Sequence, residues 1–194
     1  MNLKLVFSVI FFLTVSTIAW AQPAKFVGAG KCRVCHKKAK DGNAYGIWKK
    51  SKHAKAYALL ATGVAKKKAK ELGVKGDPQK ALECLICHVS GANLPASSFA
   101  KSFKKEEGVQ CENCHGPGSK YRKKKIMKNL RKERLAGGNK LAKKVSFLHA
   151  GEKTCIEGCH QPKRVVDGKT YINPSYKPFK YSERLAKIAH PVPK

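Results

Sequence analysis

Four short motifs, each made of two cysteines followed at once by a histidine, constrain this chain more than any other feature. All eight cysteines belong to them: Cys32-Arg33-Val34-Cys35-His36, Cys84-Leu85-Ile86-Cys87-His88, Cys111-Glu112-Asn113-Cys114-His115 and Cys155-Ile156-Glu157-Gly158-Cys159-His160. Histidine makes up only 7 of the 194 residues, so its place after every pair is not a chance result. Four disulfides or thiolate zinc sites would use the cysteines but would not require the histidines.

The spacing is typical of covalent haem c attachment. Two thiols about one helical turn apart can each add to a vinyl group of one porphyrin, while the adjacent imidazole reaches the iron. The sequence therefore predicts four covalent haem c groups, each held by two cysteines and by a proximal histidine, His36, His88, His115 or His160. The fourth motif has three residues between its cysteines instead of two, and Gly158 is expected to let this longer loop fold back.

The remaining histidines, His53, His149 and His190, are the candidate distal ligands. At most three irons can therefore have two histidine ligands. The fourth iron could bind Met127 or a lysine, or keep an open or water-occupied position, which we favour because charged residues surround Met127. We also expect His53 to share a helix face with Trp48, turned to a haem.

The amino-terminal 21 residues are typical of a secretory signal. Lys4 precedes an apolar run from Leu5 to Trp20, and the small-residue pattern that ends at Ala21 predicts cleavage before Gln22. The run is shorter than the ~20 residues that cross a bilayer. We therefore expect a periplasmic or extracellular protein that is not integral to a membrane once processed, with residues 22–194 as one tetrahaem domain.

Composition leaves little with which to build a core. Aromatic residues make up 8% of the chain, and Lys and Arg together number 41. We expect a mainly α-helical, small multihaem cytochrome c fold with little or no β-structure, in which four haems fill the core. Helices are predicted within residues 54–73 and from Asp77-Pro78 toward the second motif.

Residues 120–144 form a strongly basic segment, with twelve Lys or Arg against one acid, Glu133. They should form one or two surface helices broken at Gly137-Gly138. The formal net charge of the chain is +29, and eight haem propionates would leave it at about +20. The segment could be a solvated helix face, or it could dock an acidic redox protein or an anionic surface. Nucleic acid is not an expected partner, because the basic run lacks interleaved aromatic residues.

Several segments resemble the cytochrome c-554 family. They are Trp48-x-x-Ser51-x-His53-x-x-Ala56, Cys87-His88-Val89-Ser90-Gly91, the run from Gly108 to Gly118, Tyr176-Lys177-Pro178-Phe179-Lys180-Tyr181, and Ile188-Ala189-His190-Pro191. The resemblance implies electron transfer by four haems in a mostly helical fold, three of them bis-histidine and one five-coordinate. The family's known role is electron uptake from hydroxylamine oxidoreductase, which suggests a multihaem oxidoreductase as donor.

The resemblance also implies how the histidines pair. His149 is assigned to the first haem, His190 to the third and His53 to the fourth, which leaves the haem on His88 open, with Pro178 and Phe179 as its distal wall. Binding or reduction of nitric oxide, or of a related nitrogen species, at that haem is the alternative function. The sequence lacks the C-x-x-C-K motif expected of a multihaem nitrite reductase.

Overall fold

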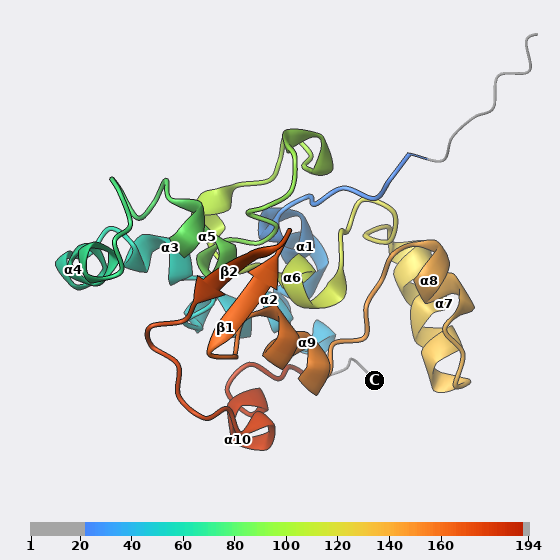
Figure 1. The fold of residues 1–194 in the computed structure, drawn as a ribbon. Helices are drawn as coiled ribbons and strands as arrows, with labels where there is room; N and C mark the ends of the chain where they lie inside the picture. Colours follow the sequence, from blue (N-terminus) through green and yellow to red (C-terminus); the bar gives the residue numbers. More distant parts are fainter. Residues whose placement is uncertain (1–21, 192–194) are drawn as a thin grey trace, which may run out of the picture.

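The computed structural model describes residues 22–191, so the expected signal at residues 1–21 lies outside the described residues. Within them the chain is mainly helical, as expected, with a single small sheet (Figure 1). The elements in order are α1 (Ala29–His36), η1 (Ala39–Asp41), α2 (Ala44–Lys50), α3 (Ala56–Leu59), α4 (Gly63–Glu71), α5 (Leu82–His88), η2 (Ala96–Ser98), η3 (Lys105–Glu107), α6 (Cys111–His115), α7 (Lys124–Leu135), α8 (Lys140–Lys144), α9 (Glu152–Gly158), β1 (Lys163–Val166), β2 (Lys169–Ile172) and α10 (Tyr181–Leu185).

The first three cysteine–histidine motifs lie on short helices, and the fourth starts in α9, with Cys159 and His160 just beyond its end. The first three motifs end α1, α5 and α6 at their histidines. Gly116, with φ 78°, ends α6 in a backbone conformation that a side chain would oppose. The backbone N–H of Gly116 donates to the carbonyl of Glu112, and its own carbonyl accepts from the Tyr121 hydroxyl at 2.6 Å. The helix ends therefore fix the directions in which the histidines leave the backbone.

The helices expected within residues 54–73 are α3 and α4, which are separate because Thr62 caps a new helix by accepting the backbone N–H of Ala65 at 3.2 Å. One helix prediction needs correction. The helix that carries the second motif begins at Leu82 and not at Asp77. Asp77 instead forms a turn in which its carboxylate accepts the backbone N–H of Gln79 at 2.9 Å.

The basic segment forms two helices, α7 and α8, as predicted. They pack against each other at one edge of the molecule, and α4 lies at the opposite edge (Figure 1). The chain between them includes Gly137 with φ 72°, which explains the break.

A β-hairpin follows the fourth motif directly. Strands β1 and β2 pair antiparallel, with Val166 opposite Lys169. Asp167 and Gly168 form the connection with φ values of 49° and 76°. Two successive positive φ values define the tight turn that matches the twist of paired strands.

Within residues 22–191, some of the buried apolar side chains gather in two small clusters. One joins Tyr121 and Leu130 of α7 to Ala142 and Val145 of the α8 region. The other centres on Trp48. Among residues 22–191 no phenylalanine is fully buried.

Candidate functional site

The cysteines of different motifs meet in pairs. The Cys32 thiol beside Cys111, together with burial, raises the pKa of Cys111. The Cys87 thiol and burial raise the pKa of Cys159 in the same way. Burial raises the pKa of Cys114, near Cys155, to about 11. The first motif thus lies against the third, and the second against the fourth.

Two of the spare histidines face the proximal histidine that the resemblance assigned to them. The ring centroids of His53 and His160 lie 6.0 Å apart, and those of His115 and His190 lie 5.9 Å apart. Two imidazoles on opposite sides of one metal ion, with metal–nitrogen bonds of about 2 Å, place their centroids about 6 Å apart. Both pairs therefore fit an iron between them.

His53 reaches its partner from a turn and not from a helix. Helix α2 ends at Lys50, and Ser51 is extended with ψ 164°, so the expectation that Trp48 and His53 share one helix face is wrong. Trp48 is buried, and its indole N–H donates to the carbonyl of Val109 at 2.8 Å. Burial lowers the pKa of His53, which favours the neutral imidazole that binds metals.

His149 gathers with the histidines of the first and third motifs. Its ring contacts Phe147 edge-on, with centroids 5.1 Å apart, and Phe147 stacks on His115 at 5.6 Å. The pKa of His115 is lowered first by burial and further by His190, His36 and His149. His149 therefore lies in the same part of the molecule as His36.

His88 makes a different set of contacts. Its Nδ1 lies 2.8 Å from the carbonyl oxygen of Ala56, and the Nδ1 of His115 lies 3.3 Å from that of Leu148. An Nδ1–H that donates to a carbonyl leaves Nε2 free for a metal and fixes the orientation of the ring. In the described part of the chain, no histidine ring is stacked against His88.

The fourth motif absorbs its extra residue in a widened last turn. The carbonyl of Cys155 accepts the backbone N–H groups of both Cys159, at 3.2 Å, and His160, at 3.0 Å. The second bond spans five residues, so His160 keeps its place above Cys155 despite the insertion. Gly158 has no positive φ and has open space beside its Cα. The expectation that its flexibility folds the loop back is therefore not supported.

The backbone before the first motif is fastened to the third motif by a buried carboxylate. Glu112 is 1% exposed and accepts the backbone N–H groups of Val27, Gly28 and Gly118, each at 2.7 Å. Gln110 adds a bond from the N–H of Ala29 at 2.7 Å. Burial raises the pKa of Glu112 although these three N–H groups favour its ionised form. Sequence reasoning missed this role, because two of the three partners of Glu112, Val27 and Gly28, lie more than 80 positions away.

The β-hairpin connects the second and fourth motifs. The guanidinium of Arg164, on β1, donates to the carbonyl of Ile86 and lies 3.7 Å from the sulfur of Cys159. Lys169, on β2, pairs with Glu83 at 2.8 Å. Positive charge thus lies beside the cysteines of two motifs.

Phe179 lies at the fourth motif. Its ring stacks on His160 with centroids 4.4 Å apart and an interplanar angle of 26°, while Pro178 is exposed. No contact given for the described residues brings either side chain to His88. Their assignment as the wall of an open haem on His88 therefore stays a prediction.

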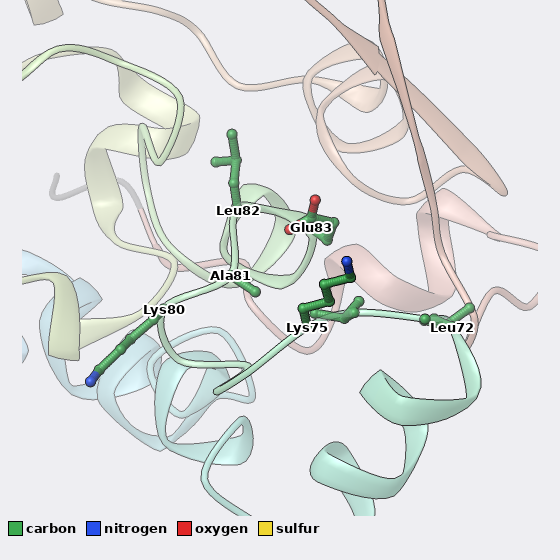
Figure 2. Close-up of a pocket in the computed structure, with 8 residues that line it drawn as sticks. Leu72, Lys75, Lys80, Ala81, Leu82 and Glu83 are labelled. Carbon is green, nitrogen blue, oxygen red and sulfur yellow. The ribbon is translucent and has the colours of Figure 1, made fainter.

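Two hollows border the second motif. One, of 580 Å³, lies between the end of α4 and the start of α5, where Lys75, Lys80 and Glu83 line it (Figure 2). The other, of 430 Å³, is mostly apolar and lies on the Leu85 and Val89 side of α5. Neither is lined by a histidine or a cysteine.

Taken together, the site residues fit covalently bound haem. The histidine pairs have a suitable separation, and two imidazoles are oriented through Nδ1. Residues 22–191 contain no group of three or more His, Cys, Asp or Glu side chains arranged to hold a metal ion, whereas haem iron takes at most two protein ligands. No helix in the same range has the length and apolar character needed to cross a membrane.

Comparisons with known proteins point to the same chemistry. Residues 31–116 match the family model described as cytochrome c554 and c-prime. Cytochrome c-554 of Nitrosomonas europaea is 39% identical over 123 residues, which are 61% of this chain and 49% of that protein, so the match spans about half of this relative. The solved structure of reduced cytochrome c554 from the same organism aligns with a TM-score of 0.45 and 26% identity over 84% of this chain and 78% of that one.

Proposed function

We propose, on the match of residues 31–116 to the cytochrome c554 and c-prime family model, that this chain is an exported tetrahaem c-type cytochrome that transfers electrons between redox partners. Three haems have two histidine ligands each, and one is five-coordinate. The observation that carries the proposal is the separation of the ring centroids, 6.0 Å between His53 and His160 and 5.9 Å between His115 and His190.

The chain's own residues bring the motifs together in pairs, as electron transfer between the haems would require. Haem c supplies one-electron chemistry when it is bound. Glu112 and Gln110 fasten the first motif to the third, and Arg164 joins the second to the fourth. Ligands that do not rearrange on reduction favour fast electron exchange, so His53, His190 and His149, as distal ligands, make their sites carriers.

The second motif is the open one. Two spare histidines are already paired elsewhere, and the third, His149, lies with His115 and His36. His88 is therefore left as a proximal ligand without a histidine opposite. Binding or reduction of nitric oxide at this iron is the alternative function, and the second motif has a 430 Å³ apolar hollow next to it.

Partners and location follow from charge and from the predicted signal. A chain with a net charge of +29 attracts acidic proteins and anionic surfaces. We infer a periplasmic or extracellular site of action, in which a multihaem oxidoreductase is one candidate donor.

Intact mass and spectroscopy of the purified protein test the proposal together. We expect a mass that corresponds to residues 22–194 with four haems, and one high-spin iron among three low-spin ones. Carbon monoxide and nitric oxide should bind at one iron per chain. Fewer than four haems, or four low-spin irons with no ligand binding, would contradict the assignment.

A further inference from the structure

The basic segment that contains α7 and α8 is built directly onto the third motif. Phe147, just after α8, stacks on His115 with an interplanar angle of 13° and meets Tyr121 edge-on at 4.9 Å. The backbone N–H of Leu148 donates to the carbonyl of His115 at 2.9 Å. The Tyr121 hydroxyl donates to the carbonyl of Gly116 at 2.6 Å. Both ends of the α7–α8 hairpin, residues 120–148, thus touch the residues that would hold the third haem.

The hairpin has its own apolar cluster, so it is a defined element and not a loose tail. Leu130 is 3% exposed and Ala142 is 3% exposed, and Ile126, Met127 and Leu141 pack around them. Met127 packs in this cluster, in agreement with the expectation that it does not bind an iron. The charged side chains are therefore displayed on a fixed scaffold.

The only acid of residues 120–144, Glu133, binds backbone N–H groups and pairs with no basic side chain of the segment. The two carboxylate oxygens of Glu133 accept the backbone N–H groups of Leu141, at 2.6 Å, and Ala142, at 3.0 Å. They cap the start of α8. Eleven of the twelve basic residues of this segment are exposed, and no ion pair within residues 22–191 includes any of the twelve. The hairpin therefore shows solvent an uncompensated positive surface.

We propose that the exposed face of the α7–α8 hairpin docks an acidic redox protein and brings it to the third haem. The inference rests on the proposed electron-carrier function and names the surface that serves it. Charge complementarity speeds encounter, and the packing of Phe147 and Leu148 on His115 puts the docked partner next to one particular haem. An acidic protein is favoured over a membrane, because an electron carrier needs a redox partner, and the exposed charges set beside His115 would orient one there.

A pair of matched variants tests the proposal. Lys125, Lys128 and Lys132 are exposed, and their spacing of three and four residues puts them on one face of α7. The hairpin variant replaces all three by Gln. The control replaces Lys66, Lys67 and Lys70 of α4, also exposed, by Gln. The two variants lose the same charge at opposite edges of the molecule (Figure 1).

The electron donor is a reduced plant-type [2Fe–2S] ferredoxin, used as an acidic probe in stopped-flow reduction of the oxidised holoprotein. At low ionic strength we expect the second-order rate constant to fall roughly five- to tenfold in the hairpin variant and less than about twofold in the control. The difference should vanish at high salt. Carbodiimide cross-links to the ferredoxin should fall within residues 120–144.

Each other outcome has a definite meaning. Equal rates in the two variants would overturn docking at the hairpin while leaving the carrier function intact. Loss of binding to phosphatidylglycerol vesicles by the hairpin variant, with unchanged ferredoxin kinetics, would overturn it in favour of a membrane surface. If the wild-type protein binds haem but accepts no electrons from the ferredoxin or from dithionite, the proposed function itself fails.

Discussion

The ring centroids of His115 and His190 lie 5.9 Å apart, although His190 stands close to the carboxyl end of the chain. The same separation recurs between His53 and His160. Because the partners of each pair come from distant segments, the tertiary fold, and not the local motif, decides which irons are closed. The number of high-spin irons should therefore report how many of these histidine pairs form in the folded protein.

Removing one distal histidine should open one more iron. His53→Ala and His190→Ala are each expected to raise the high-spin content by one haem per chain, with the haem count by mass unchanged, because the cysteines still hold the porphyrin. Electron paramagnetic resonance of the ferric protein measures this. Lys52→Ala, next to His53 and exposed, is the control and should leave the spectrum as in the wild type. An unchanged spectrum for His53→Ala would show that it is not a ligand.

Replacing either of two glycines near the motifs by alanine should affect stability to different extents. Gly116 has φ 78°, and a Cβ there would run into the carbonyl oxygen of Ser146, so Gly116→Ala should lower the free energy of unfolding by about 1–3 kcal/mol. Gly158→Ala meets nothing within 4 Å and should stay within about 0.5 kcal/mol of the wild type. Urea unfolding of the holoprotein compares them. Loss of the fourth haem in Gly158→Ala would restore a special role for this glycine.

Glu112→Gln should weaken the connection between the first and third motifs. The amide can accept the N–H groups of Val27 and Gly118 but turns its own N–H₂ toward that of Gly28. We expect the free energy of unfolding to fall by about 1–3 kcal/mol. Ser119→Ala, which removes the acceptor of the N–H of Lys25 at a less buried place, should cost less. An equal loss of unfolding free energy in both variants would contradict a special role of Glu112 in connecting the two motifs.

The cost of Glu112→Gln should depend on pH. Burial raises the pKa of Glu112 in the folded protein, so the unfolded chain releases this proton at a lower pH than the folded one. The contribution of Glu112 to stability is therefore complete below the ordinary glutamate pKa and declines as the pH rises through the raised value. The difference in unfolding midpoint between wild type and variant should narrow from pH 4 toward neutrality. A difference that widens over this range would mean that the three N–H groups outweigh burial.

Arg164 should raise the reduction potentials of the haems on the second and fourth motifs. Its guanidinium lies 3.7 Å from the sulfur of Cys159, and positive charge disfavours the oxidised iron. Arg164→Gln should shift two of the four midpoint potentials downward in spectroelectrochemical titration. Lys169→Gln removes one positive charge from the same hairpin, but from an exposed pair with Glu83, and should shift them much less. Similar shifts in both variants would mean that the net charge of the protein, and not the position of Arg164, sets the potentials.

The sequence is most informative where the chemistry is local. The motifs place Cys32, Cys35 and His36 on one short helix without help from the rest of the chain, and the glycines at 137 and 138 mark the break between α7 and α8. The Asp167-Gly168 pair is a local hairpin signal, whereas the four-residue strands beside it are too short to show a clear alternating pattern.

Other features depend on contacts that no local pattern contains. A helical reading of residues 46–57 put His53 on a helix, whereas the extended Ser51 turns the chain first. No local pattern distinguishes Arg164 from the other basic residues of the chain, but it donates to the carbonyl of Ile86, 78 positions earlier. Such roles follow from tertiary packing, and a count of residue types cannot assign them.

The bonds made by Glu112 also bear on the order in which the protein matures. Val27, Gly28 and Ala29 are held by residues that lie 81 to 85 positions later, and a chain is synthesised from its amino end. The first motif must therefore wait, without its hydrogen-bond acceptors, until the third motif has been made. During that interval its thiols stay accessible, so we expect haem attachment at the first motif before the chain folds around it.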